Sequence, residues 1–192
     1  MGKGRLEAFS DGVLAVIITI MVLEMKVPHG AGLDALTSVL PVFLVYVLSF
    51  VYIAIYWNNH HHLLRSVEHI DGRVMWANLH LLFWLSMIPF VTGWMGENHY
   101  AALPTAVYGV VLLLAAVAWQ PLQHGLIACN GGRDSRLAKA VKGDMKGKLA
   151  IVLYALGVGL AFVNQWIADA LYILVAVMWL VPDRRIERML SE

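Results

Sequence analysis

Long apolar stretches separated by short polar segments are the dominant pattern of this chain of 192 residues. A helix needs about 20 apolar residues to cross the hydrocarbon of a bilayer, and fewer where neighbouring helices bury it. The pattern therefore predicts an all-α integral membrane protein, with six transmembrane helices in one unit that covers residues 1–192. The expected spans are 9–27, 36–57, 74–94, 103–129, 149–163 and 166–181.

Composition agrees with this class. Charged residues make up 14% of the chain and hydrophobic residues 60%, whereas about a quarter of the residues in a soluble domain are charged. The formal net charge of +1 provides no basic surface for nucleic acid. The expected surroundings are a lipid bilayer, and no nucleic-acid partner is expected.

Positive charges divide unevenly between the loops, and positive charge is normally retained on the cytoplasmic side. Six spans put every lysine and arginine except Lys26 on one side, which places both termini in the cytoplasm. The basic residues on that side are Lys3, Arg5, Arg65, Arg73, Arg133, Arg136, Lys139, Lys142, Lys146, Lys148, Arg184, Arg185 and Arg188. A cytoplasmic basic loop is expected over 130–148, with an amphipathic helix from Ser135 to Lys148. The external loops are expected to carry Glu24, Asp34, Glu97 and Asp169.

Ser10 and Asp11 lie at the edge of the first apolar run. A carboxylate at the edge of hydrocarbon is costly, so it normally faces a bundle interior or water and has a partner. The block WNNHHH, residues 57–62, ends the second run at the same membrane level. We expect one or two of its histidines, with Asn59, to hydrogen-bond Ser10 and Asp11. Asn78 in the third run needs a partner of the same kind.

One side of the first helix is smooth and apolar apart from a single hydroxyl group. At helical spacing this stripe includes Val16, Ile20 and Leu23, with Thr19 beside them. If copies of the helix surrounded an axis, the stripe would form a narrow hydrophobic constriction next to a ring of Thr19 hydroxyls. Ordinary helix packing explains the same periodicity, so the stripe alone does not distinguish the two.

Several kinds of chemistry have no support in the sequence. Adjacent histidines point in different directions on a helix, so His60, His61 and His62 cannot all bind one metal ion. No nucleophile is paired with a base, and no glycine-rich phosphate loop or hydrolytic acidic pair is present. The carbonyl filter TVGYG is absent as well, which excludes the usual potassium-channel design. We therefore expect no enzyme activity, no metal site and no cofactor.

The motif Arg5-x-x-x-Phe9-Ser10-Asp11 resembles the signature of the transmembrane protein 175 family, which are potassium channels of lysosomes and of prokaryotic cell membranes. The block Trp57-x-Asn59-His60-His61 resembles the motif at the end of that family's second helix, and Asn78 with Pro89-Phe90 fits its third. The resemblance covers the whole chain. It implies a leak-type potassium channel made of four single-repeat chains in a bacterial plasma membrane.

The resemblance also implies roles for individual residues. The first helix of each chain would line the conduction path, with the family's constricting residue at Val16 and a selectivity threonine at Thr19. Ile20 and Leu23 continue the stripe, and either is a candidate for the narrowest point because valine is smaller than the family's isoleucine or leucine. A network of the motif residues would set the tilt of this helix. Its members are Arg5, Phe9, Ser10, Asp11, Trp57, Asn59, His60, His61 and Asn78.

Three other functions stay open at this point. Asp11 with His60 or His61 would form a proton relay in a proton channel or a proton-coupled transporter. No acidic residue is expected near the membrane midplane, which counts against that relay. His60, His61 or His80 would suit a haem-binding redox protein, because haem is often held by histidine. The last alternative is a non-conducting scaffold.

Overall fold

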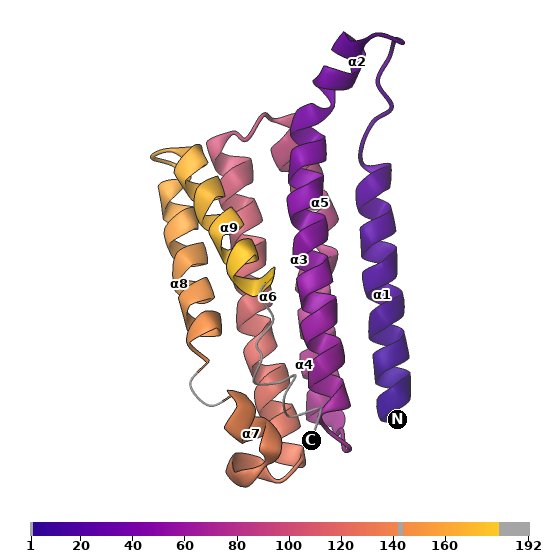
Figure 1. The fold of residues 1–192 in the computed structure, drawn as a ribbon, viewed down its shortest axis with the longest axis vertical. Helices are drawn as coiled ribbons and strands as arrows, with labels where there is room; N and C mark the ends of the chain where they lie inside the picture. The colour runs from indigo at the N-terminus through magenta and orange to yellow at the C-terminus, as the bar shows by residue number, and fades with distance from the viewer. Residues whose placement is uncertain (1, 142–143, 181–192) are drawn as a thin grey trace.

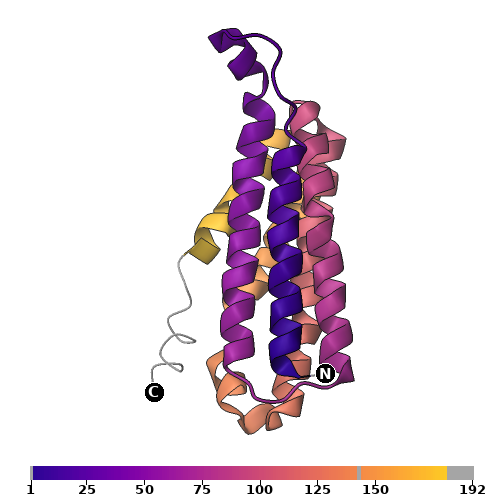
Figure 2. The ribbon, with the colours of Figure 1, turned by 90° about the vertical axis from the view of Figure 1, so that its right-hand side faces the viewer.

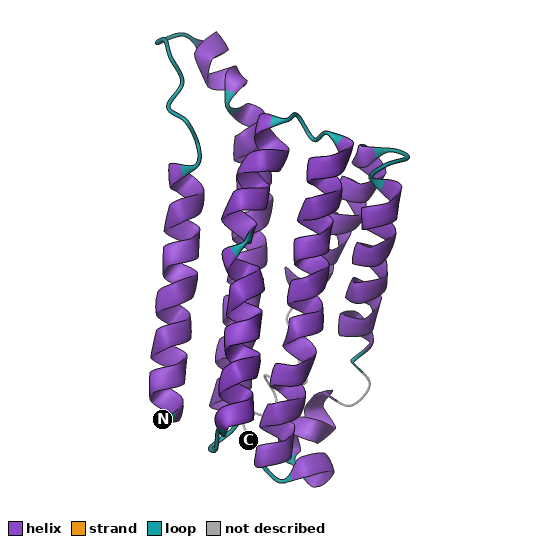
Figure 3. Cartoon of the chain, turned by 180° about the vertical axis from the view of Figure 1, so that it is seen from behind, coloured by secondary structure: helices purple, strands orange, loops and turns teal. Residues whose placement is uncertain are grey.

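The structure is a computed structural model that describes residues 2–141 and 144–180. Over these ranges the chain forms a bundle of helices connected by loops (Figures 1 and 3), and it has the expected all-α class. The elements are α1 (Lys3–Leu23), α2 (Leu33–Ser38), α3 (Leu40–Arg65), α4 (Gly72–Ser86), α5 (Ile88–Glu97), α6 (Ala102–Cys129), the 3₁₀ helix η1 (Gly132–Asp134), α7 (Arg136–Val141), α8 (Met145–Leu160) and α9 (Gln165–Leu180).

The helix α6 lies in the middle of the bundle and contacts α4, α5, α8 and α9. At one edge, α1 packs against α3, α4 and α5, and at the opposite edge α8 and α9 form a hairpin (Figures 1 and 2). Buried aliphatic and tyrosine side chains fill the interior, among them Tyr52, Tyr108 and Tyr172. The first helix is therefore attached to the bundle along one side only.

Four segments of the described chain are long and apolar enough to cross a membrane: α1, α3, the consecutive helices α4 and α5, and α6. The helix α9 is apolar but has only 16 residues, and α8 has the same length. These four segments overlap the first four spans expected from the sequence. The expected fifth span overlaps α8 and the sixth overlaps α9, although Val181 lies outside the described residues.

The third expected span is two helices and not one. It breaks at Met87, between α4 and α5, and Pro89 lies in the first turn of α5. Proline has no N–H to continue the helical hydrogen bonds and its ring clashes with the preceding turn. The second expected span is shifted: α3 starts at Leu40, with a proline in its first turn, and continues through the histidines to Arg65. Residues 36–38, at the start of that expected span, belong to the separate helix α2.

The amphipathic helix expected from Ser135 to Lys148 is divided. The helix α7 ends at Val141, residues 142–143 lie outside the described ranges, and Asp144 then starts α8 by accepting a hydrogen bond from the backbone N–H of Gly147 (2.8 Å). Such an N-cap satisfies a backbone donor at the start of a helix, which favours a new helix at this point. The basic tail around Arg184 also lies outside the described residues.

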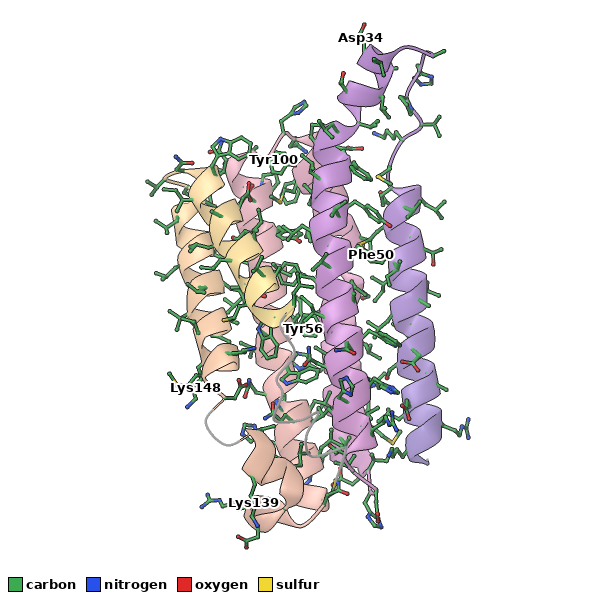
Figure 4. All side chains as sticks on the ribbon, in the orientation of Figure 1. Asp34, Phe50, Tyr56, Tyr100, Lys139 and Lys148 are labelled. Carbon is green, nitrogen blue, oxygen red and sulfur yellow. The ribbon has the colours of Figure 1, made fainter. Side chains whose placement is uncertain are left out.

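The two ends of the bundle differ in charge. Lys139 and Lys148 lie at the end that also holds the N-terminus, whereas Asp34 and Tyr100 lie at the other end (Figure 4). At that second end, Lys26 forms an ion pair of 2.7 Å with Glu97. Asp169, which was expected in an external loop, is instead buried within α9 and is only 7% exposed. The helices α3, α6 and α8 pack against α9.

Candidate functional site

One face of α1 packs into the bundle. Its buried residues are Leu6, Ser10, Leu14, Ile17 and Met21, which recur every three or four positions as one side of a helix does. They are covered by α3, α4 and α5. The only polar member is Ser10, so the packed face is apolar except at the level of the motif residues.

The opposite face of α1 is apolar and uncovered. Val16 is 55% exposed, Ile20 41% and Leu23 80%, and Phe9 lies on the same side near the other end of the helix. Thr19 is exposed next to them, and its hydroxyl donates to the carbonyl of Ala15 (2.6 Å). Its lone pairs remain accessible, because a hydroxyl that donates one hydrogen bond can still accept others. We call Val16, Thr19, Ile20 and Leu23 the α1 stripe.

A groove of about 690 Å³ lies between α1 and the break that separates α4 from α5. Phe9, Val16 and Ile20 line it from α1, and Pro89 and Phe90 line it from α5. Phe90 is 62% exposed at its edge. An apolar surface of this kind on a bundle is typical of a contact with another chain or with lipid.

Ser10, Asn78 and His60 form a buried hydrogen-bonded network that joins three helices. The Asn78 Nδ2 amide donates to Ser10 Oγ (3.0 Å), and Asn78 Oδ1 lies 2.7 Å from His60 Nε2. Ser10 Oγ donates in turn to the carbonyl of Leu6 (2.8 Å). Since Oδ1 can only accept, His60 carries its proton on Nε2, and its buried Nδ1 has no hydrogen-bond partner among the described residues. Asn78 thus bridges Ser10 and His60.

A second set of contacts joins α1 to α3 nearer the surface. Trp57 Nε1 donates to Asp11 Oδ1 (3.0 Å), and His61 Nδ1 lies 3.1 Å from Glu7 Oε1. The rings of Trp57 and His61 are stacked, with centroids 6.1 Å apart. The Asp11 carboxylate therefore pairs with the indole of Trp57, and not with a histidine as the sequence predicted.

Glu7 is a member of this interface that sequence reasoning missed. A usable signal exists, since Glu7 and Asp11 are four residues apart on α1, and Trp57 and His61 are four apart on α3. Two acceptors and two donors at the same helical spacing can pair in register.

For two of the predicted network residues, Arg5 and Asn59, the structure records no side-chain hydrogen bond between helices. Arg5 is exposed near the start of α1. The Asn59 amide donates to the carbonyl of Ile55 on its own helix (2.8 Å). Among the described residues, no group of three or more His, Cys, Asp or Glu side chains is placed to hold a metal ion.

Several known proteins are similar to this chain. The family model for the endosomal/lysosomal potassium channel TMEM175 matches residues 5–89. A potassium channel of Chryseobacterium sp. (strain P1-3) is 51% identical over 192 residues, which is 100% of both chains. The endosomal/lysosomal proton channel TMEM175 of Gallus gallus is 34% identical over 101 residues, which is 46% of this chain and 20% of that protein.

A solved structure has the same fold. The crystal structure of a lysosomal potassium-selective channel TMEM175 homolog from Chamaesiphon minutus superposes with a TM-score of 0.83 and 27% sequence identity. The superposition covers 94% of this chain and 97% of that one. The matched residues 5–89 include the whole network of α1, α3 and α4 and all of the α1 stripe. The family match, the full-length relative and the shared fold agree, and the chain belongs to the TMEM175 family.

Proposed function

We propose that four copies of this chain form a leak-type potassium channel whose pore is lined by α1. The observation that carries the proposal is the α1 stripe, which is apolar, uncovered and on the helix that packs by its other face only. A symmetric assembly would bring the four stripes together. The Chryseobacterium relative, which is similar over its whole length, is named a potassium channel.

In this proposal all six apolar helical segments span the membrane, with α8 and α9 as the short fifth and sixth spans. Both termini then lie in the cytoplasm, because the described lysines and arginines other than Lys26 belong to the end of the bundle that holds the N-terminus. The relatives with full-length similarity are bacterial. We accordingly place the channel in a bacterial plasma membrane.

Selectivity in such a pore comes from partial dehydration at a hydrophobic constriction. Potassium has a weaker field than sodium and releases its water more easily, so it crosses an apolar ring at lower cost. The ring is made by Val16, Ile20 or Leu23, and the adjacent Thr19 hydroxyl oxygens replace part of the lost hydration. No carbonyl cage is needed for a moderate preference of this kind.

The test is a flux assay on purified protein in liposomes under a potassium gradient, repeated with sodium. We expect potassium flux to exceed sodium flux, and Val16→Asn or Ile20→Asn to change the rate or the selectivity by several-fold. The matched control is Val22→Asn, because Val22 is also exposed on α1 but lies about 120° around the helix from Val16. Equal effects of the three substitutions would place the pore elsewhere.

A proton channel is the second candidate, supported by the name of the Gallus gallus relative and by its similarity over 46% of this chain. Its relay would use Asp11 and His60 or His61 at the interface of α1 and α3. A proton-sensitive dye in the same liposomes separates the two functions. Proton flux that persists without potassium and is lost in Asp11→Asn would favour this candidate over the first.

A further inference from the structure

Asp169 is a buried carboxylate that the proposed pore does not use. It lies one turn into α9, at the edge of the bundle opposite α1, and is 7% exposed. Neither of its oxygens has a hydrogen-bond partner within the described chain. An ionised carboxylate without a partner is very costly to bury, so such a group is either neutral or neutralised by something bound.

Three tyrosines lie close enough to Asp169 for a charge there to act on them: Tyr172 on α9, Tyr108 on α6 and Tyr100 in the loop before α6. From the other elements packed on α9, Tyr52 of α3 and Tyr154 of α8 approach Tyr172 instead. The ion pairs found in the described residues join Lys26 to Glu97 and His61 to Glu7, and neither involves Asp169.

The hydroxyl hydrogens of these three tyrosines are directed away from the carboxylate. Tyr172 donates to the carbonyl of Thr105 (3.3 Å), and Tyr100 donates to the carbonyl of Pro41 (2.9 Å). Tyr100 lies outside the apolar helices, and its partial burial raises its pKa, which keeps the hydroxyl protonated.

The direction of the hydrogen bond between Tyr108 and Ser49 follows from a chain of three hydroxyl groups. Thr92 uses its hydrogen on the carbonyl of Ile88 (2.7 Å), so Ser49 must donate to Thr92 (2.7 Å). Tyr108 must then donate to Ser49 (3.0 Å). None of the three tyrosine hydrogens is left for Asp169.

A metal ion does not fit this position. Hard cations such as Ca²⁺ take six or more oxygen ligands, whereas Asp169 is a lone carboxylate, and no acidic, histidine or cysteine cluster suited to a metal occurs in residues 2–141 and 144–180. A proton needs no further ligand and removes the charge completely. It is the occupant that the surroundings can accommodate.

We propose that Asp169 is a proton-binding site of the folded protein, and that its ionisation loosens the packing of α9 on α6. The packing is vulnerable there because Tyr172, one turn further along α9, fills the space beside Gly109 of α6 and Gly157 of α8. This site lies outside the α1 stripe and does not depend on the proposed channel function.

The first test is infrared spectroscopy of the purified full-length protein at neutral pH. We expect the carbonyl-stretch band of a protonated carboxylic acid in the wild-type protein, and its loss in Asp169→Asn. The matched control is Asp34→Asn, because Asp34 is an exposed carboxylate at the same end of the bundle and its removal should leave the band unchanged. A wild-type spectrum without this band would overturn the proposal.

The second test follows thermal unfolding from about pH 5 to about pH 8. A carboxylic acid that must ionise in a buried site destabilises the folded state as the pH rises. The wild-type melting temperature should therefore fall over this range relative to that of Asp169→Asn. A difference between the two proteins that stays constant with pH would overturn the proposal. A melting temperature that depends on the choice of potassium, sodium or a large organic cation only when Asp169 is present would show that the site holds a cation and not a proton.

Discussion

Asn78 is the residue at which three helices meet. Its backbone belongs to α4, its amide nitrogen donates to Ser10 of α1, and its amide oxygen accepts from His60 of α3. All three side chains are buried. Because an amide offers a donor and an acceptor on one rigid group, asparagine can satisfy a serine and a histidine together, which an aspartate or a leucine cannot.

Asn78→Leu should lower the free energy of unfolding by about 1–3 kcal/mol, because Ser10 and His60 lose partners in a buried site. The measurement is denaturation of the purified protein in detergent. Asn59→Leu is the matched control, since the recorded hydrogen bond of the Asn59 amide lies within α3 and a smaller loss is expected. A loss in Asn59→Leu that equals or exceeds the loss in Asn78→Leu would contradict this account of the network.

The sequence indicated that Ser10, Asp11, His60 and Asn78 needed partners, since polar groups in hydrocarbon must be paired. It did not indicate which groups pair, because Asn78 is 68 residues from Ser10 and 18 from His60. Separations of this size depend on how the helices are rotated about their axes. The exchange of partners, with Asp11 on Trp57 and Ser10 on Asn78, follows from the rotation of α1 against α3 and α4.

At the scale of elements, α9 is held by a tyrosine in a cleft made by two glycines. Tyr172 lies against Gly109 of α6 and Gly157 of α8, and its ring centroid is 5.9 Å from that of Tyr108. The absence of a side chain at both glycines lets the three helices approach closely, as small residues do between membrane helices.

Gly109→Ala should destabilise the protein by about 1–3 kcal/mol, because the new methyl group overlaps the Tyr172 hydroxyl and overpacking forces the neighbours to move. Gly159→Ala is the control on α8, where an added Cβ meets nothing within 4 Å. It should be neutral or stabilising, since alanine favours a helix over glycine by up to about 1 kcal/mol. Comparison of the two melting temperatures gives the result, and equal values would refute a tight contact at Tyr172.

Element boundaries show where sequence patterns are sufficient. The apolar run of α6 predicted a helix over 103–129, and the structure has Ala102–Cys129. The pattern failed where a local feature interrupts a uniform composition: Pro89 divides α4 from α5, and the Asp144 cap starts a new helix inside the basic segment. Hydropathy is averaged over a window of residues, so a single proline or capping residue hardly changes it. The same residue ends or starts a run of backbone hydrogen bonds.

At the scale of the whole molecule, α1 lies at an edge of the bundle (Figure 2), and the α1 stripe is exposed within the described part of the chain. The groove beside Phe90 extends this uncovered surface along the break between α4 and α5. Four chains around an axis would bury the stripe towards the axis and the α5 side of the groove, with Pro89 and Phe90, against a neighbouring α1.

We therefore expect the detergent-solubilised protein to have a mass about four times the 21.3 kDa of one chain. Native mass spectrometry measures this directly. Phe90→Gln should shift the protein towards smaller species, because it removes an exposed aromatic side chain from the expected contact. Phe83→Gln is the control, as Phe83 is also exposed but does not line the groove. A monomer in the wild-type protein would exclude a pore made by four α1 helices.

The unequal lengths of the helices have a consequence for the surrounding lipid. At 1.5 Å per residue, the 28 residues of α6 extend about 42 Å, whereas the 16 residues of α8 and of α9 extend only about 24 Å each. The hydrocarbon of a typical bilayer is about 30 Å thick. If the short hairpin spans the membrane, its side of the protein is thinner than the bilayer, and lipid must thin there at an energetic cost. The acyl-chain length of the host membrane then determines how far the bilayer must thin beside α9, at the outer edge of the bundle.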